Sequence, residues 1–99
     1  MSNLKSIAAG ELSDGRIQVF AIDNSGNLQS RWKETTDPNS SWTNWSNFQT
    51  PSGGVISLGV GTLPDKRLQL FGVDSNGNPV SCWKITVESE SAWTPWSGF

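Results

Sequence analysis

Residues 15–33 read GRIQVFAIDNSGNLQSRWK, and residues 66–84 read KRLQLFGVDSNGNPVSCWK. When the chain is aligned with itself at a shift of 51 positions, this match extends without a gap from residues 6–48 over residues 57–99. In that register 20 of the 43 aligned pairs are identical, and all six tryptophans lie within the repeat. The chain is therefore two copies of one unit, which we assign to residues 1–50 (with a linker at the end) and residues 51–99.

Turn-forming residues divide each copy into four short segments. In the first copy the turns are rich in Asp, Asn, Ser and Gly, and the segments between them are residues 6–12, 16–22, 28–35 and 41–48. No segment has a sustained apolar period of 3.6 residues, which an amphipathic helix requires. The pattern predicts an all-β fold with four antiparallel strands in each copy.

A repeat of about 50 residues that carries four strands is typical of a β-propeller blade. Small residues in the first segment, such as Ala8 and Gly10, suit an innermost strand where blades converge. The second segment has apolar side chains on both faces, for example Val19 and Phe20, as expected of a sheet between two neighbours. We expect a propeller of four-stranded antiparallel blades, with two blades per chain.

Two blades cannot close a ring, because propellers have four to eight. A lone chain would expose an apolar blade face at each end. We therefore expect a homo-oligomer: first a trimer with six blades, and second a tetramer with eight. The alternative is an engineered or excised fragment of a longer propeller.

Composition favours a binding protein over the other classes. The net charge is −2 and the seven Lys and Arg are scattered, whereas a nucleic-acid partner favours a basic stripe. The chain has no His and one Cys, so we expect no cofactor and no metal site. The sequence has no His that could act as a general base, no nucleophile motif and no phosphate-binding loop. We therefore expect that the chain is not an enzyme. No apolar run is long enough for membrane insertion.

The repeated motifs resemble those of a known family. They are GRIQVFAID (residues 15–23), SGNL (25–28), RWK (31–33) and WTNWS (42–46), with KRLQLFGVD (66–74) and WTPWS (93–97) in the second copy. They are similar to the repeats of bacterial propeller lectins, namely the fucose-binding lectins of Photorhabdus and the related tectonin-type repeats. The resemblance covers both copies and implies a propeller that binds glycans.

The trimeric Ralstonia-type fucose lectins are also two-blade chains of about this length. Their sugar sites use an Arg in the second strand, a Glu in the third and a Trp near the fourth. The corresponding positions here are about Gln18, Gln29 and Trp42, so the charged pair is missing. We carry over the two-blade assembly from this comparison, and not the fucose triad.

The candidate sugar-binding residues are aromatic or basic, because an indole stacks on a sugar ring and a guanidinium donates to hydroxyls. For each Trp the alternative is a place in the core, as we expect for Trp32 and Trp83. Within each pair spaced by three, we expect one Trp in the core between blades and the other near a crevice, unless a bulge intervenes. The candidates are Trp42, Trp45, Trp93, Trp96, Arg16, Arg67 and Arg31.

The arginines have alternatives of their own. Arg16 and Arg67 each follow an Asp by two residues, so a local ion pair that orients the hairpin is the alternative to a sugar contact. Arg31 is replaced by Cys82 in the second copy, which predicts two non-equivalent classes of site.

The sequence thus predicts a lectin for a fucose-like or other neutral sugar, with sites in crevices between blades. The alternative function is a protein-interaction scaffold without a selected sugar.

Overall fold

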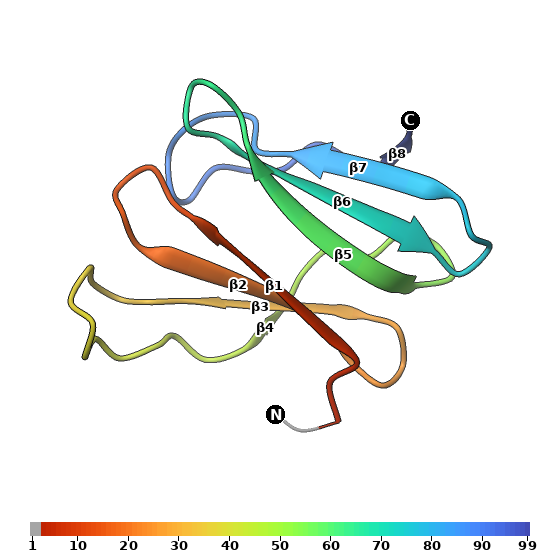
Figure 1. Cartoon of the computed structure of the whole chain (residues 1–99), viewed down its shortest axis with the longest axis horizontal. Coiled ribbons are helices and arrows are strands. Elements are labelled where there is room, and N and C mark those ends of the chain that lie inside the picture. The colour runs from red at the N-terminus through yellow and green to blue at the C-terminus, as the bar shows by residue number, and fades with distance from the viewer. Residues whose placement is uncertain (1–2) are drawn as a thin grey trace.

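The computed structural model describes residues 3–99 and consists of two four-stranded antiparallel sheets (Figure 1). The first sheet, in the order β1-β2-β3-β4, contains β1 (Ser6–Glu11), β2 (Ile17–Ile22), β3 (Leu28–Trp32) and β4 (Ser46–Asn47). The second, in the order β5-β6-β7-β8, contains β5 (Val55–Thr62), β6 (Leu68–Asp74), β7 (Pro79–Trp83) and β8 (Ser97–Gly98). There is no helix within residues 3–99, and the predicted all-β class is confirmed. The first two residues of the predicted first unit lie outside the described residues.

Carboxylates in the turns explain why the strands end where they do. The Asp23 Oδ1 atom accepts hydrogen bonds from the backbone N–H groups of Ser25 and Asn27, at 2.9 and 3.0 Å. Gly26 in the same turn has a φ of 85°, which an L side chain rarely adopts. The turn between β2 and β3 is therefore specified by local side-chain chemistry.

The fourth strand is shorter than the sequence predicts. In place of a strand over residues 41–48, the structure has β4 (Ser46–Asn47) and one isolated bridge between Lys33 and Trp42. The register shifts by one residue between this bridge and the Ser30–Ser46 pair, so the segment between them is irregular.

The third strand also ends earlier than predicted, at Trp32 and not at residue 35. In the loop that follows, side chains form hydrogen bonds with backbone N–H groups that a longer strand would use for pairing. The Ser40 hydroxyl accepts the Thr35 N–H at 2.8 Å, and the Asp37 carboxylate accepts the Asn39 N–H at 2.8 Å. Such local bonds favour a loop over a strand.

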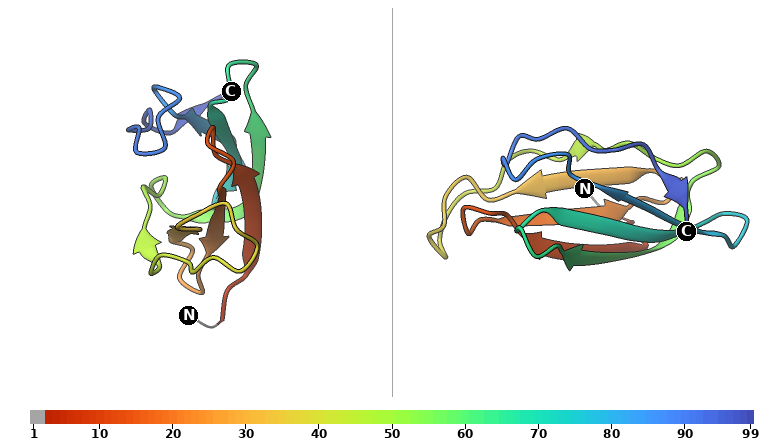
Figure 2. Two further views of the ribbon diagram at one scale, coloured as in Figure 1. Left: turned by 90° about the vertical axis from the view of Figure 1, so that its left-hand side faces the viewer. Right: turned by 90° about the horizontal axis from the view of Figure 1, so that it is seen from above.

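The two sheets meet along β1 and β5, which lie side by side (Figure 2). A Cβ atom at Gly10 would lie 2.7 Å from the Val60 Cγ1 atom, closer than real side chains approach. A glycine is thus required where β1 contacts the second sheet. Gln49 adds a polar link between the units. Its side-chain Nε2 donates to the Thr94 backbone carbonyl (2.6 Å), and its backbone carbonyl accepts from Trp96 Nε1 (3.0 Å).

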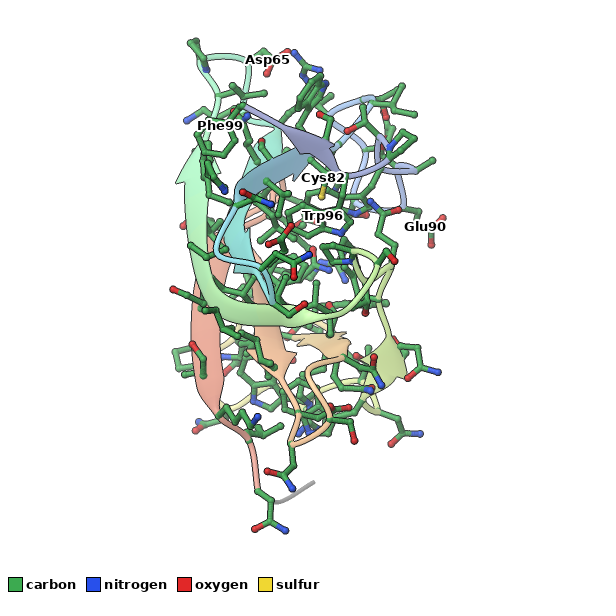
Figure 3. The ribbon with its side chains drawn as sticks, turned by 90° about the vertical axis from the view of Figure 1, so that its right-hand side faces the viewer. Asp65, Cys82, Glu90, Trp96 and Phe99 are labelled. Carbon is green, nitrogen blue, oxygen red and sulfur yellow. The ribbon has the colours of Figure 1, made fainter. Side chains whose placement is uncertain are left out.

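The core that joins the sheets takes side chains from both. Leu12 and Phe20 come from the first unit, and Leu68, Leu70 and Cys82 come from the second. Cys82 is fully buried and Trp96 is half-buried against the core, whereas Phe99 lies at the periphery (Figure 3). Burial raises the pKa of the Cys82 thiol to about 12, so the thiol is protonated at neutral pH.

Each sheet has one face in this core, which we call its joined face, and one face outside it, its open face. Side chains alternate along a strand, so neighbouring residues point to different faces. On the first sheet Phe20 lies on the joined face, and Ile17 and Val19 lie on the open face. On the second sheet Leu70 lies on the joined face and Phe71 on the open face.

Candidate functional site

A cleft of about 360 Å³ lies between the two sheets and is lined by both units. The first unit contributes β2, β3 and β4 together with the turn before β2. The second unit contributes the loop that precedes Trp93. The lining residues are Arg16, Gln18, Ser30, Trp32, Ser46, Asn47 and Phe48 from the first unit, and Ser89, Glu90, Ser91 and Trp93 from the second.

Arg16 is held rigidly at the edge of this cleft. Its Nε donates to the Asp14 carboxylate at 2.9 Å, and its NH1 donates to the Lys33 carbonyl at 3.3 Å. Desolvation favours the neutral form of Asp14, but hydrogen bonds and charge from Arg16 outweigh it and lower the Asp14 pKa. The expected local ion pair is therefore present, and the same guanidinium also lines the cleft.

The inner part of the cleft combines amide, hydroxyl and indole groups. Gln18 Nε2 donates to the Ser30 hydroxyl at 2.9 Å, and both side chains are buried. Trp93 makes edge-to-face contacts with Phe20 and Phe48, at centroid distances of 5.7 and 5.1 Å. Trp93 is thus part of the core and also part of the cleft wall.

The opposite wall is formed by Ser89, Glu90 and Ser91, which belong to the loop of residues 85–92. Lys84, which is 2% exposed, anchors this loop because its Nζ donates to the Ser89 carbonyl at 3.1 Å. Burial disfavours the ammonium and lowers the Lys84 pKa. The Glu90 side chain is exposed at the cleft.

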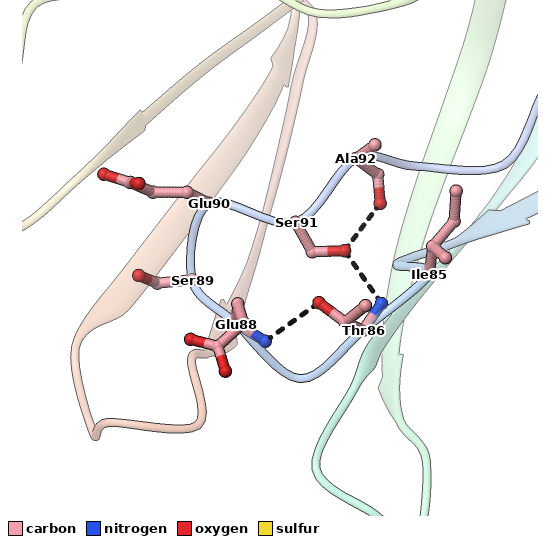
Figure 4. Close-up of a pocket in the computed structure, with 7 residues that line it drawn as sticks. All are labelled: Ile85, Thr86, Glu88, Ser89, Glu90, Ser91 and Ala92. Carbon is pink, nitrogen blue, oxygen red and sulfur yellow. Dashed lines mark hydrogen bonds between the residues drawn. The ribbon is translucent and has the colours of Figure 1, made fainter.

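The same loop encloses a second hollow of about 420 Å³, whose described lining residues all belong to the second unit (Figure 4). Its polar groups largely bond to one another. The Ser91 hydroxyl accepts from the Thr86 N–H and donates to the Ala92 carbonyl, both at 2.8 Å. The cleft between the sheets is the better candidate, because it offers an indole, a guanidinium and a carboxylate together.

The structure brings two of the predicted site residues, Arg16 and Trp93, into this cleft. Arg67 lies elsewhere, in a shallow hollow on the open face of the second sheet that it shares with Leu63, Gln69 and Trp83. Trp96 lies against the core.

Trp42, Trp45 and Arg31 form a separate group on the open face of the first sheet. The Arg31 Cζ atom lies 5.7 Å from the Trp42 ring centroid and 5.2 Å from that of Trp45. The expectation that paired tryptophans point to opposite faces is wrong here, because the register shift before β4 places both rings against one guanidinium.

Three residues that line the cleft were not predicted from the sequence: Gln18, Asn47 and Glu90. Gln18 recurs with Ser30 in the second copy as Gln69 and Ser81, which also form a hydrogen bond, of 2.8 Å. That shared pair was a signal of a structural role. Glu90 has no such signal, because its counterpart is Asn39.

Within residues 3–99 there is no group of three or more side chains suited to a metal ion, and no helix long and apolar enough to cross a membrane. Comparison with known protein families finds no family that matches the chain, and comparison with curated proteins finds no match either.

Proposed function

We propose that the chain is a carbohydrate-binding protein that binds a neutral monosaccharide, fucose-like or another, in the cleft between its two sheets. In this proposal the sheets are neighbouring blades of a propeller. The observation that carries it is the meeting of the Trp93 indole with Arg16 and Glu90 in one open cleft.

The chemistry of the cleft matches the chemistry of a sugar ring. A pyranose has an apolar C–H face that packs against an indole and hydroxyls that both donate and accept hydrogen bonds. Arg16 supplies donors, and Glu90 supplies an acceptor. The resemblance to bacterial propeller lectins supports the same class of ligand.

A single open site of this size binds weakly. We expect a dissociation constant between about 1 mM and 1 μM, or roughly 4–8 kcal/mol. Stronger attachment to a glycan-covered surface then requires several sites on one particle.

The test is titration of ¹⁵N-labelled protein with neutral monosaccharides, fucose among them, read by NMR. The indole N–H signal of Trp93 and the signals of residues 89–91 are expected to shift on saturation. Glu90→Gln and Arg16→Ala are expected to weaken binding about tenfold each, since a lost charged hydrogen bond costs roughly 1.5 kcal/mol.

Glu88→Gln is the matched control, because Glu88 lines the neighbouring hollow and not the cleft. Weakening by Glu88→Gln without an effect of Glu90→Gln would place the ligand in that hollow and contradict the proposed site. If no monosaccharide causes a saturable shift and no glycan on an array is bound, a protein-interaction scaffold is favoured instead.

A further inference from the structure

An aromatic cluster joins the two units, and two of its three rings have counterparts on the open face of the second sheet. Phe20 and Phe48 lie edge to face, at a centroid distance of 5.3 Å, and Trp93 of the second unit packs against both. The counterparts of the two phenylalanines, Phe71 and Phe99, form the same edge-to-face pair at 5.7 Å. Within residues 3–99 no third ring packs against that pair, and Phe99 is 71% exposed.

The counterpart of Trp93 is Trp42, and it lies on the open face of the first sheet. Trp42 is 36% exposed. The open face of the second sheet therefore carries the counterparts of two rings of the cluster, and the open face of the first sheet carries the counterpart of the third.

Two further apolar residues on the open face of the first sheet, Ile17 and Ile7, also have counterparts in the joined core. Ile17 is 41% exposed, whereas its counterpart Leu68 is fully buried in the joined core. Ile7 is 63% exposed, whereas its counterpart Leu58 packs against that core. Exposed apolar side chains that repeat a buried interface indicate a surface that another subunit covers.

We propose that a second copy of this chain docks head to tail, with the open face of its first sheet on the open face of the second sheet of its neighbour. The new junction repeats the one within the chain, so Trp42 of the second copy completes the cluster with Phe71 and Phe99. Such an interface is heterologous, because it joins two different faces. Repeated copies form a closed ring when the rotation from one copy to the next divides a full turn evenly.

Docking also completes a second ligand cleft. The shallow hollow formed by Arg67, Gln69 and Trp83 matches one wall of the cleft within the chain. The second copy supplies the other wall, its loop around Asn39. This step rests on the proposed function of the cleft, whereas the docking itself does not.

The two clefts differ in charge. Asn39 stands where the cleft within the chain has Glu90. The cleft between chains therefore has the Arg67–Asp65 ion pair but not the facing carboxylate of Glu90. We expect it to accept acidic sugars, which the carboxylate of Glu90 repels in the other cleft.

The docking test uses one blocking variant for each open face. Ile17→Asp places a charge on the open face of the first sheet, and Phe99→Asp places one on that of the second. Both residues are exposed, so each variant is expected to keep its circular dichroism spectrum. Ile17→Ser and Phe99→Ala serve if either fails to fold.

Light scattering at micromolar concentration, without sugar, gives the masses. The unaltered chain is expected to exceed the 10.8 kDa monomer mass, and each variant alone is expected to be a monomer. An equimolar mixture of the two variants is expected to form a dimer, because it retains one intact pair of faces. A folded wild-type monomer, or a dimer of either variant alone, would overturn head-to-tail docking.

Calorimetry with fucose and with an acidic monosaccharide, glucuronic acid, counts the bound sugars of both kinds and separates the two proposals. Two sites per chain in the assembly and one in each monomeric variant support the second cleft. One site per chain in both forms overturns the second cleft and leaves the proposed function intact. An assembly that binds no sugar overturns the proposed function and leaves docking intact.

Discussion

Lys66 adopts a backbone conformation that side chains with a Cβ atom rarely tolerate. Its φ is 79°, and the matching turn of the first unit has Gly15 there, with a φ of 91°. A left-handed conformation costs a non-glycine residue roughly 1–2 kcal/mol, and glycine avoids this cost while losing more chain entropy. The second unit is therefore strained at a position where the first is not.

We predict that Lys66→Gly raises the free energy of unfolding by about 0.5–1 kcal/mol, the difference between those two effects. Urea denaturation followed by tryptophan fluorescence measures it. Gly15→Lys, which imposes the strain on the first unit, is expected to lower the same quantity. An unchanged midpoint for both variants would show that these turns relax without cost.

The strand elements differ in how far the sequence specifies them. The β2–β3 turn was predictable because Asp23 and Gly26 carry their own turn chemistry. The end of β3 and the short β4 were not, because the register shift near Trp42 depends on pairing with β3. Local residue types encode turns, whereas a bulge depends on the partner strand.

The hairpin turns also set how stability depends on pH. Desolvation favours the neutral form of Asp23, but hydrogen bonds from Asn27, Ser25 and Gln29 outweigh it and lower the pKa below its ordinary value of 3.8. A carboxylate whose pKa is lower in the folded state stabilises the fold above the unfolded pKa. That contribution is lost as the pH falls below 3.8 and through the folded pKa.

We therefore predict that the free energy of unfolding decreases between neutral pH and pH 2, with the steepest change below about 4. Asp23→Asn keeps an oxygen that accepts in the turn and removes the charge, so its curve is expected to be flatter over this range. Denaturation curves at a series of pH values measure both proteins. Parallel curves would rule out Asp23 as a source of the dependence.

At the scale of the whole molecule, the sequence predicted the repeat, and with it part of the site. Arg16 and Trp93 were identifiable as candidates because they are repeated polar and aromatic residues. That they share one cleft with Glu90 was not predictable, because it depends on how the loop of one unit packs against the sheet of the other. Which apolar residues lie on the open faces was likewise not predictable, because it depends on the register of the strands.

Arg31 is the main difference between the proposed junction and the one within the chain. It occupies the place of Cys82, which is fully buried in the joined core, and its Nε donates to the Thr43 carbonyl at 3.0 Å. Docking would remove this guanidinium from water, and desolvating a charge without an ionic partner opposes association. Arg31 should therefore weaken the junction between chains relative to the junction within a chain.

We predict that Arg31→Cys, which copies the second unit, strengthens self-association about tenfold, or roughly 1.4 kcal/mol. The measurement is the concentration at which the assembly dissociates, followed by light scattering under reducing conditions. Lys66→Ser is the matched control, since it changes the net charge equally but lies in a turn. If Arg31→Cys instead weakens association while the control has no effect, the guanidinium contributes to the junction through Trp42 and Trp45, and the close equivalence of the two junctions fails at this position.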